Sequence, residues 1–201
     1  AHISHEIRTP MNGILGITEL LRQTQLSNKQ EHFVDTVYRS GATLLTLLND
    51  VLDLSKVEAG KVELERIRFD LDKTVREVVD LLVDQAQGKG IKLTCVLDES
   101  IPSVLQGDPV RLQQVLMNLV SNALKFTERG SVTLTAALEE DSASHTVVRF
   151  EVQDTGIGVA PAAHTKIFDA FSQADGSTAR KFGGTGLGLS IVKQLILLME
   201  G

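Results

Sequence analysis

The sequence lacks the residues that would place it among disulfide-bonded, metal-clustered or membrane-spanning proteins. Cys95 is the only cysteine in 201 residues, so neither an internal disulfide nor a cysteine metal cluster can form, and its apolar neighbours predict a buried thiol. No run of about 18 apolar residues is present, as a membrane-spanning helix would require. The net charge is -6 and no basic cluster stands out. We therefore expect no nucleic-acid partner and no membrane contact.

The first third of the chain has the pattern of a helical hairpin. Apolar residues recur every three or four positions along residues 3–57, which predicts two helices separated by a polar stretch over residues 24–30. Gly60 is placed to end the second helix. A lone hairpin leaves part of each apolar stripe uncovered. The pattern therefore favours a second copy, which would give a homodimer with a four-helix bundle.

The remainder of the chain mixes helical and strand-like patterns. It predicts helices over residues 71–86, 109–126, 162–171 and 188–199, and strands over residues 91–97, 132–138 and 147–152. Asp108 followed by Pro109 is typical of a helix start. Residues 139–145 are polar and predict a hairpin loop, whereas residues 172–186, rich in Gly, Ser and Thr, indicate a mobile segment. The fold class is α+β, with the second part an α/β sandwich that carries its helices on one face of a sheet.

The segment Ser4-His5-Glu6-Ile7-Arg8-Thr9-Pro10 places a nucleophile beside a carboxylate. Imidazole is largely neutral near pH 7 and is a good nucleophile. Glu6 can accept a proton or a hydrogen bond from the ring. Pro10 removes the helical hydrogen bond to the Glu6 carbonyl, which predicts a bend beside His5. Taken alone, the segment also fits a surface histidine before a helix-kinking proline.

Three further patterns point to a phosphate-bearing ligand. Asn118, Asn122 and Lys125 share one helix face, where amide oxygens suit Mg²⁺ and an ammonium neutralises phosphate. Asp154-Thr155-Gly156-Ile157-Gly158 follows a strand; its carboxylate can accept a hydrogen bond from an exocyclic amine, and its glycines allow close approach. Gly183-Gly184-Thr185-Gly186-Leu187-Gly188 leads into the final helix, whose first amides favour phosphate. It is neither a P-loop nor a dinucleotide fingerprint. Each pattern alone also fits an exposed stripe or a turn.

Together these segments resemble the histidine protein kinases of two-component signalling, and the resemblance covers nearly the whole chain. Residues 4–10 match the phosphoacceptor motif at every position. Residues 118–127, 154–158, 167–171 and 183–188 match, in the family order, the N, G1, F and G2 boxes of the ATP-binding domain shared with Hsp90, DNA gyrase and MutL (the GHKL type). Residues 5–13 and 53–60 look most similar to hybrid sensor kinases.

The resemblance implies phosphorylation of His5 by Mg-ATP, followed by transfer to an aspartate of a receiver domain. It implies that Glu6 is the general base and that Thr9 orients water when the receiver is dephosphorylated. Asn122 would be the Mg²⁺ ligand with Asn118 nearby, Asp154 would bind adenine, and Lys125 would lie near the phosphates. The other nucleotide-site residues are implied by the glycine boxes, the F box and the lid: Gly156, Gly158, Phe168, Phe171, Arg180, Lys181, Gly184, Gly186 and Gly188.

The resemblance also implies a dimerisation and phosphoacceptor domain over residues 1–66 and a catalytic ATP-binding domain over residues 67–201. In the family the sheet continues past the position of Gly201, so a trimmed cytoplasmic part of a larger sensor is expected. Two rival interpretations stay open. One is a degenerate kinase that only binds partners; its marker would be loss of a residue such as His5 or Asn122, and both are present. The other is an Hsp90-like switch, which would not need His5.

Overall fold

The computed structural model describes residues 2–60, 62–142, 144–172 and 186–201, with the backbone alone for residues 2–5 and 58. Contacts between Cα atoms divide the chain into two compact units, Ala1–Ala59 and Gly60–Gly201. The division falls after Ala59, whereas the boundary expected from the sequence lies between residues 66 and 67. None of the helices in the described part is long and apolar enough to cross a membrane.

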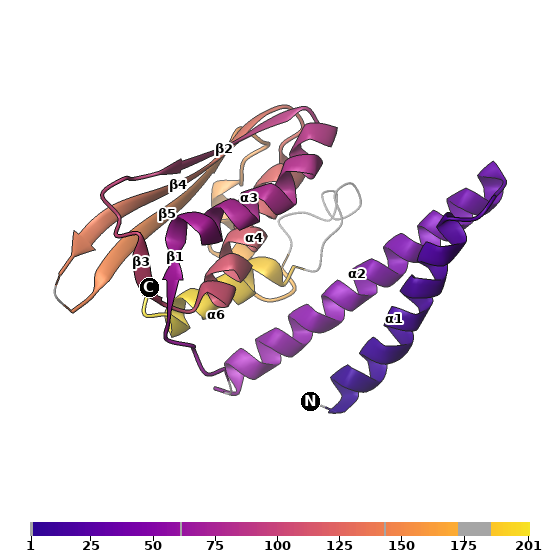
Figure 1. The fold of residues 1–201 in the computed structure, drawn as a ribbon, viewed down its shortest axis with the longest axis horizontal. Helices are drawn as coiled ribbons and strands as arrows, with labels where there is room; N and C mark the ends of the chain where they lie inside the picture. Colours follow the sequence, from indigo (N-terminus) through magenta and orange to yellow (C-terminus); the bar gives the residue numbers. More distant parts are fainter. Residues whose placement is uncertain (1, 61, 143, 173–185) are drawn as a thin grey trace. The chain divides into compact units, whose positions relative to one another are not determined.

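The first unit is a hairpin of α1 (His2–Arg22) and α2 (Asn28–Glu58), as predicted (Figure 1). At the start of α2 the Gln30 side chain accepts a hydrogen bond from the Ser27 N–H at 3.0 Å, which occupies a donor that a helix start leaves open. Gly60, with φ +62, ends the helix as expected. The helices approach closely at Gly41, where an added Cβ would lie 3.0 Å from Leu15 Cδ2.

Large apolar side chains stay exposed on both helices of this single hairpin: Ile7, Ile14, Ile17, Leu20, Leu21, Phe33, Val37, Leu44 and Val51. They recur at helical spacing, so they form stripes rather than scattered residues. Apolar stripes of this length are costly to leave in water, and soluble helical proteins cover them by association. The second copy expected from the sequence stays a prediction, and these stripes are the surface it would cover.

The second unit is a three-stranded sheet with helices on one face, which confirms the predicted sandwich (Figure 1). The strand order is β2 (Ile91–Leu97), β4 (Gly130–Asp141), β5 (Thr146–Asp154); β2 and β4 are parallel, and β4 and β5 antiparallel. The helices are α3 (Leu71–Gly88), α4 (Pro109–Phe126) and α6 (Gly188–Leu198). The apolar faces of α3 and α4 and the inner face of β4 form one core, which includes Val75, Val78, Leu82, Leu116, Val120, Leu124, Val132 and Leu134. Helix α6 packs against α4.

Two short strands were not predicted. β1 (Ile67–Asp70) and β3 (Val104–Gly107) form a separate antiparallel sheet. Each has only four residues and no fully buried one, so the alternation that marks a half-buried strand is too short to read. This small sheet fixes residues 67–70 to the second unit.

Residues 162–171 do not form the predicted helix. They contain two 3₁₀ turns, Pro161–Ala163 and Lys166–Phe168. Phe171 has φ +61, a left-handed conformation that no helix residue can adopt, and its N–H donates to the Gly186 carbonyl at 3.1 Å. The tertiary contact with residue 186 therefore overrides a short helical pattern.

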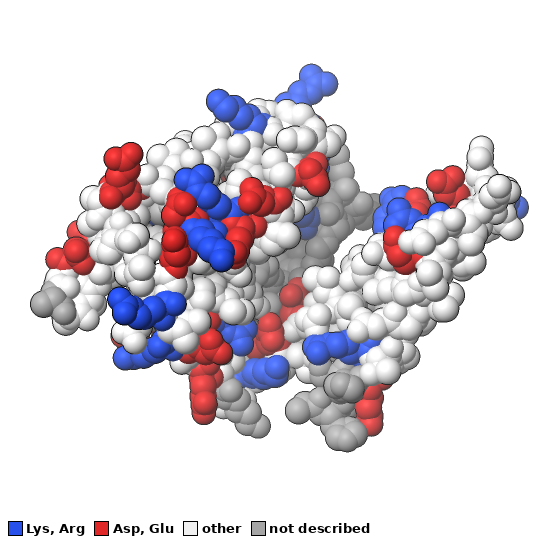
Figure 2. Space-filling model, viewed as in Figure 1, with Lys and Arg blue, Asp and Glu red and all other residues white. Residues whose placement is uncertain are grey.

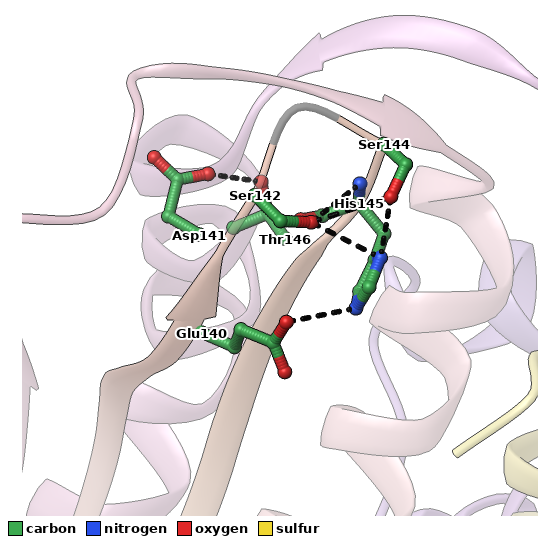
Figure 3. A network of polar contacts seen from close by, with 6 residues as sticks. All are labelled: Glu140, Asp141, Ser142, Ser144, His145 and Thr146. Carbon is green, nitrogen blue, oxygen red and sulfur yellow. Dashed lines mark hydrogen bonds and ion pairs between the residues drawn. The ribbon is translucent and has the colours of Figure 1, made fainter.

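The loop of the β4–β5 hairpin is also shorter than the predicted 139–145. The strands continue through polar residues to Asp141 and from Thr146, because the hairpin tip is in solvent and its side chains bond to one another (Figure 3). Thr146 Oγ1 donates to Asp141 Oδ1 at 2.8 Å, and Ser142 Oγ donates to the His145 carbonyl at 2.8 Å. His145 Nε2 lies 3.4 Å from Glu140 Oε1. Exposed contacts of this kind order the tip and add little stability.

The core position of α4 leads to a first prediction. Leu116 is fully buried, so Leu116→Ala should leave a cavity and destabilise the second unit by about 2–5 kcal/mol. Leu81→Ala, on a side chain that is 72% exposed, is the matched control and should change stability by no more than about 0.5 kcal/mol. Hydrogen exchange of the α4 amides measures the stability of this unit separately from that of the hairpin. Equal effects of the two substitutions would contradict the assignment of α4 to the core.

Candidate functional site

The polar face of α4 carries the three residues that the sequence grouped together. Asp108 caps the helix by accepting the Arg111 N–H at 3.0 Å. Asn118, Asn122 and Lys125 are all partly buried, although they are polar. Asn118 Nδ2 donates to the Gln114 carbonyl at 3.0 Å, which fixes the orientation of the amide. Burial lowers the pKa of the Lys125 ammonium, because removal from water disfavours its charged form. A nearby anion would stabilise this charge.

The two asparagines face the start of α6. An added Cβ at Gly188 would lie 2.9 Å from Asn118 Oδ1 and 3.8 Å from Asn122 Nδ2. Only glycine therefore allows both amides to lie directly beside the N-terminus of this helix. Its first backbone amides carry the positive end of the helix dipole and favour anions. Amide oxygens beside such a terminus are a donor set that fits a phosphate group with its bound Mg²⁺.

The loop after β5 is built against the end of α4. Asp154 Oδ1 accepts the Gly156 N–H at 2.8 Å, and the Ile157 N–H donates to the Phe126 carbonyl at 3.3 Å. An added Cβ at Gly156 would lie 2.5 Å from Phe126 O, so glycine is required by close approach. Gly158 has φ +69, which glycine adopts without strain. The Asp154 carboxylate stays exposed at the site and is accessible to a ligand.

Thr155, for which the sequence suggested no role, holds this loop on β4 by hydrogen bonds. Its hydroxyl accepts the Ser131 N–H at 3.0 Å, and its own N–H donates to the Ser131 carbonyl at 3.1 Å. Threonine between a carboxylate and a glycine has no distinct pattern of its own. The position inside the Asp-x-Gly-x-Gly motif was the only signal that could have identified it.

The F box and the G2 box meet through the backbone. Phe171 bonds to the Gly186 carbonyl, and an added Cβ at Gly186, whose φ is +70, would lie 3.0 Å from Ser172 O. The Phe168 and Phe171 side chains are 38% and 66% exposed, which is unusual for aromatic residues. Arg180, Lys181, Gly184 and the interior of the predicted mobile segment lie outside the described residues.

The predicted phosphoacceptor residues belong to α1 of the first unit. The backbone of His5 is helical, and its side chain lies outside the described atoms. Glu6 and Thr9 are exposed on the same helix, which continues through Pro10. Within the hairpin, Arg8 donates to Asn49 Oδ1 at 2.9 Å.

A cavity of about 480 Å³ in the second unit shares no residue with this site. It lies at the start of α3 and the end of β2, where Arg76 Nε pairs with Asp72 Oδ2 at 2.7 Å. Cys95 lines the cavity and is half-buried, whereas the sequence predicted a buried thiol. Desolvation raises the pKa of this thiol. The raised pKa keeps the thiol protonated, and therefore unreactive, near neutral pH.

Comparison with protein families matches both parts of the chain. Residues 107–201 match the family described as histidine kinase-, DNA gyrase B- and HSP90-like ATPase, and residues 1–60 match the His Kinase A (phospho-acceptor) domain. The sensor protein GacS of Pseudomonas syringae pv. syringae is 46% identical over the whole chain. The signal transduction histidine-protein kinase BarA of Escherichia coli (strain K12) is 47% identical, also over the whole chain. The chain spans 22% of the length of each of these two proteins.

Solved structures give the same result. Full-length ShkA in complex with AMPPNP is 41% identical, with a TM-score of 0.80 over all of this chain and 40% of that one. The catalytic domain of the histidine kinase ThkA is 32% identical, with a TM-score of 0.53 over 66% of this chain and 80% of that one. ThkA in complex with the response regulator TrrA is 27% identical, with a TM-score of 0.63 over all of this chain and 54% of that one.

The contact at Gly188 leads to a second prediction. Gly188→Ala should push the Asn118 amide out of place and weaken binding of an ATP analogue by about tenfold, or about 1.4 kcal/mol. Gly88→Ala is the control, because an added Cβ there meets nothing within 4 Å. Titration of both variants with a fluorescent ATP analogue in the presence of Mg²⁺ measures the difference. Unchanged affinity in Gly188→Ala would remove Asn118 and Gly188 from the binding site.

Proposed function

Because the chain belongs to the histidine kinases, we propose that it transfers the γ-phosphoryl group of Mg-ATP to His5 and then to a receiver-domain aspartate. The observation that carries this proposal is the meeting of Asn118, Asn122 and Gly188 at the N-terminus of α6. Amide groups and a helix N-terminus together suit a metal-bound phosphate. The phosphoacceptor segment at residues 4–10 provides the nucleophile.

In this proposal each part of the second unit holds a different part of the nucleotide. Asn122, with Asn118 beside it, holds Mg²⁺, which neutralises phosphate charge when it is bound. The Lys125 ammonium lies near the phosphates, which would offset the desolvation that now lowers its pKa. Asp154 accepts a hydrogen bond from the adenine amine, while Gly156 and Gly158 let the base come close to the backbone.

The remaining assignments concern the segment between the F and G2 boxes. Phe168 and Phe171 anchor one end of a lid, and Gly184, Gly186 and Gly188 bring backbone amides to the phosphates. Support for Phe171 and Gly186 comes from the hydrogen bond between their backbones. Arg180 and Lys181 are proposed to reach the γ-phosphate on the sequence pattern alone.

The chemical step that we propose forms a P–N bond at His5. A ring nitrogen of His5 attacks the γ-phosphorus, the bond to the ADP oxygen breaks, and Glu6 accepts the proton from the ring. Glu6 adjoins His5 on α1 and is exposed, so it is accessible for this role. Thr9, about one turn further along the helix, is proposed to orient the water that hydrolyses the phosphoaspartate of the receiver. Most of the rate enhancement would come from positioning and charge stabilisation.

Two protein partners follow from the same proposal. A second copy would cover the apolar stripes of the hairpin and complete a four-helix bundle. A receiver domain is the acceptor, and the solved complex of ThkA with a response regulator supports this class of partner.

Figure 2 shows acidic and basic side chains interspersed over the visible face of each unit, which gives no support for a nucleic-acid surface. Because ATP is the proposed phosphoryl donor, we also propose that the reaction takes place in the cytoplasm.

The third prediction tests the acceptor. Incubation with γ-labelled Mg-ATP should label the chain, and the label should be lost in acid, because phosphohistidine is acid-labile. His5→Gln should abolish the label and leave binding of an ATP analogue unchanged. His32→Gln, on the exposed side of α2, is the control and should be labelled normally.

Three outcomes would contradict the proposal. A label that persists in His5→Gln would mean a different acceptor. Nucleotide binding without any label would favour the partner-binding scaffold, whereas ATP turnover unaffected by His5→Gln would favour the Hsp90-like switch.

A further inference from the structure

The last carbonyls of α4 accept hydrogen bonds from the cap residue Thr127 and from two segments outside the helix. An α-helix leaves its last four carbonyls without helical partners. Here each of the four accepts a hydrogen bond: Ala123 O from the Thr127 N–H at 3.0 Å, Leu124 O from Lys89 Nζ at 2.7 Å, Lys125 O from Lys89 Nζ at 3.3 Å, and Phe126 O from the Ile157 N–H at 3.3 Å. One lysine side chain thus satisfies two of the four carbonyls.

The backbone around Lys89, which is distant from α4 in the sequence, holds this residue where its side chain can reach the end of that helix. It lies in the turn between α3 and β2, where its own N–H donates to the Ala86 carbonyl at 3.1 Å and Gly90, with φ +67, reverses the chain. From there its ammonium reaches carbonyls 35 and 36 residues further along the sequence. Ammonium-to-carbonyl bonds are charge-assisted, and a cation at a helix C-terminus also stabilises the negative end of the helix dipole.

The turn that Lys89 closes carries residues of the nucleotide site on both of its sides. Lys125, proposed to lie near the phosphates, belongs to this turn. The carbonyl of the next residue, Phe126, accepts the Ile157 N–H and lies so close to Gly156 that an added Cβ there would clash with it. Both Gly156 and Ile157 belong to the loop that contains Asp154. Movement of this turn would therefore displace a phosphate contact and the loop proposed to bind the base together.

We propose that Lys89 is a positioning residue of the nucleotide site, which acts by holding the C-terminal turn of α4 and does not touch the nucleotide. The inference rests on the proposed function, since it concerns the same site. Loss of the ammonium leaves the Leu124 and Lys125 carbonyls without this donor, so the turn frays and Lys125 and the 154–158 loop lose their fixed places. The effect falls on nucleotide affinity, whereas His5, Glu6 and the transfer step are unaltered.

The test compares Lys89→Met, which keeps the aliphatic stem, with Lys89→Arg, which keeps a donor cation. Lys92→Met is the matched control, because Lys92 is an exposed lysine three residues along on β2. Calorimetric titration with the Mg²⁺ complex of a non-hydrolysable ATP analogue measures affinity, and γ-labelled ATP at saturation measures the rate of transfer to His5. We expect Lys89→Met to bind about five- to tenfold more weakly, with a transfer rate at saturation within about twofold of the parent. Lys89→Arg and Lys92→Met should bind as the parent chain does.

Several results would overturn the inference. They are unchanged affinity in Lys89→Met, equal weakening in Lys92→Met, failure of Lys89→Arg to restore affinity, or a fall in the saturated rate with affinity intact. If Lys89→Met does not fold, as judged by circular dichroism, Lys89→Gln takes its place and is held to the same outcomes. A parent chain that binds no nucleotide would instead refute the proposed function. A parent that binds, with a variant that binds equally well, would refute only the role of Lys89.

Discussion

The second unit of this chain is organised by the hydrogen bonds that the C-terminal end of α4 requires. Where α4 ends, its last carbonyls must find donors, and these come from Thr127, Lys89 and Ile157. Lys89 and Ile157 belong to separate segments, so satisfying the helix end also ties the α3–β2 turn and the loop after β5 to the helix that carries Asn122 and Lys125. The need of these backbone carbonyls for hydrogen-bond donors thereby fixes the segments that form the proposed nucleotide site.

Glycine then sets how closely the parts of that frame approach. At Gly156 and Gly188 an added Cβ would lie within 3 Å of Phe126 O and Asn118 Oδ1, respectively. The first contact brings the Asp154 loop onto the end of α4, and the second brings the start of α6 onto the asparagine face. These two glycines are required by close approach, whereas Gly158 and Gly186 are favoured by their positive φ angles. The motif positions therefore require glycine for two different reasons, which are close approach and a positive φ angle.

A buried carboxylate ties the first residues of the second unit to α4. Asp108 accepts the Arg111 N–H with one oxygen and the Glu65 N–H, at 3.1 Å, with the other. The cap of the asparagine-bearing helix thus also anchors the segment that leads to β1. In the first unit the governing constraint is different, because a two-helix hairpin has too few faces to cover its own apolar stripes.

Periodicity and motif spacing in the sequence determined the long helices, the central strands and the grouping of Asn118, Asn122 and Lys125, because these depend on local patterns of three to seven residues. The pattern failed at β1, β3 and residues 162–171, where segments are short and a contact between Phe171 and Gly186 decides the backbone. Only the tertiary structure could bring Lys89 to Leu124, Thr155 to Ser131 and Gly188 to Asn118. These partners lie 24 to 70 residues apart, and their bonds leave no local pattern in the sequence.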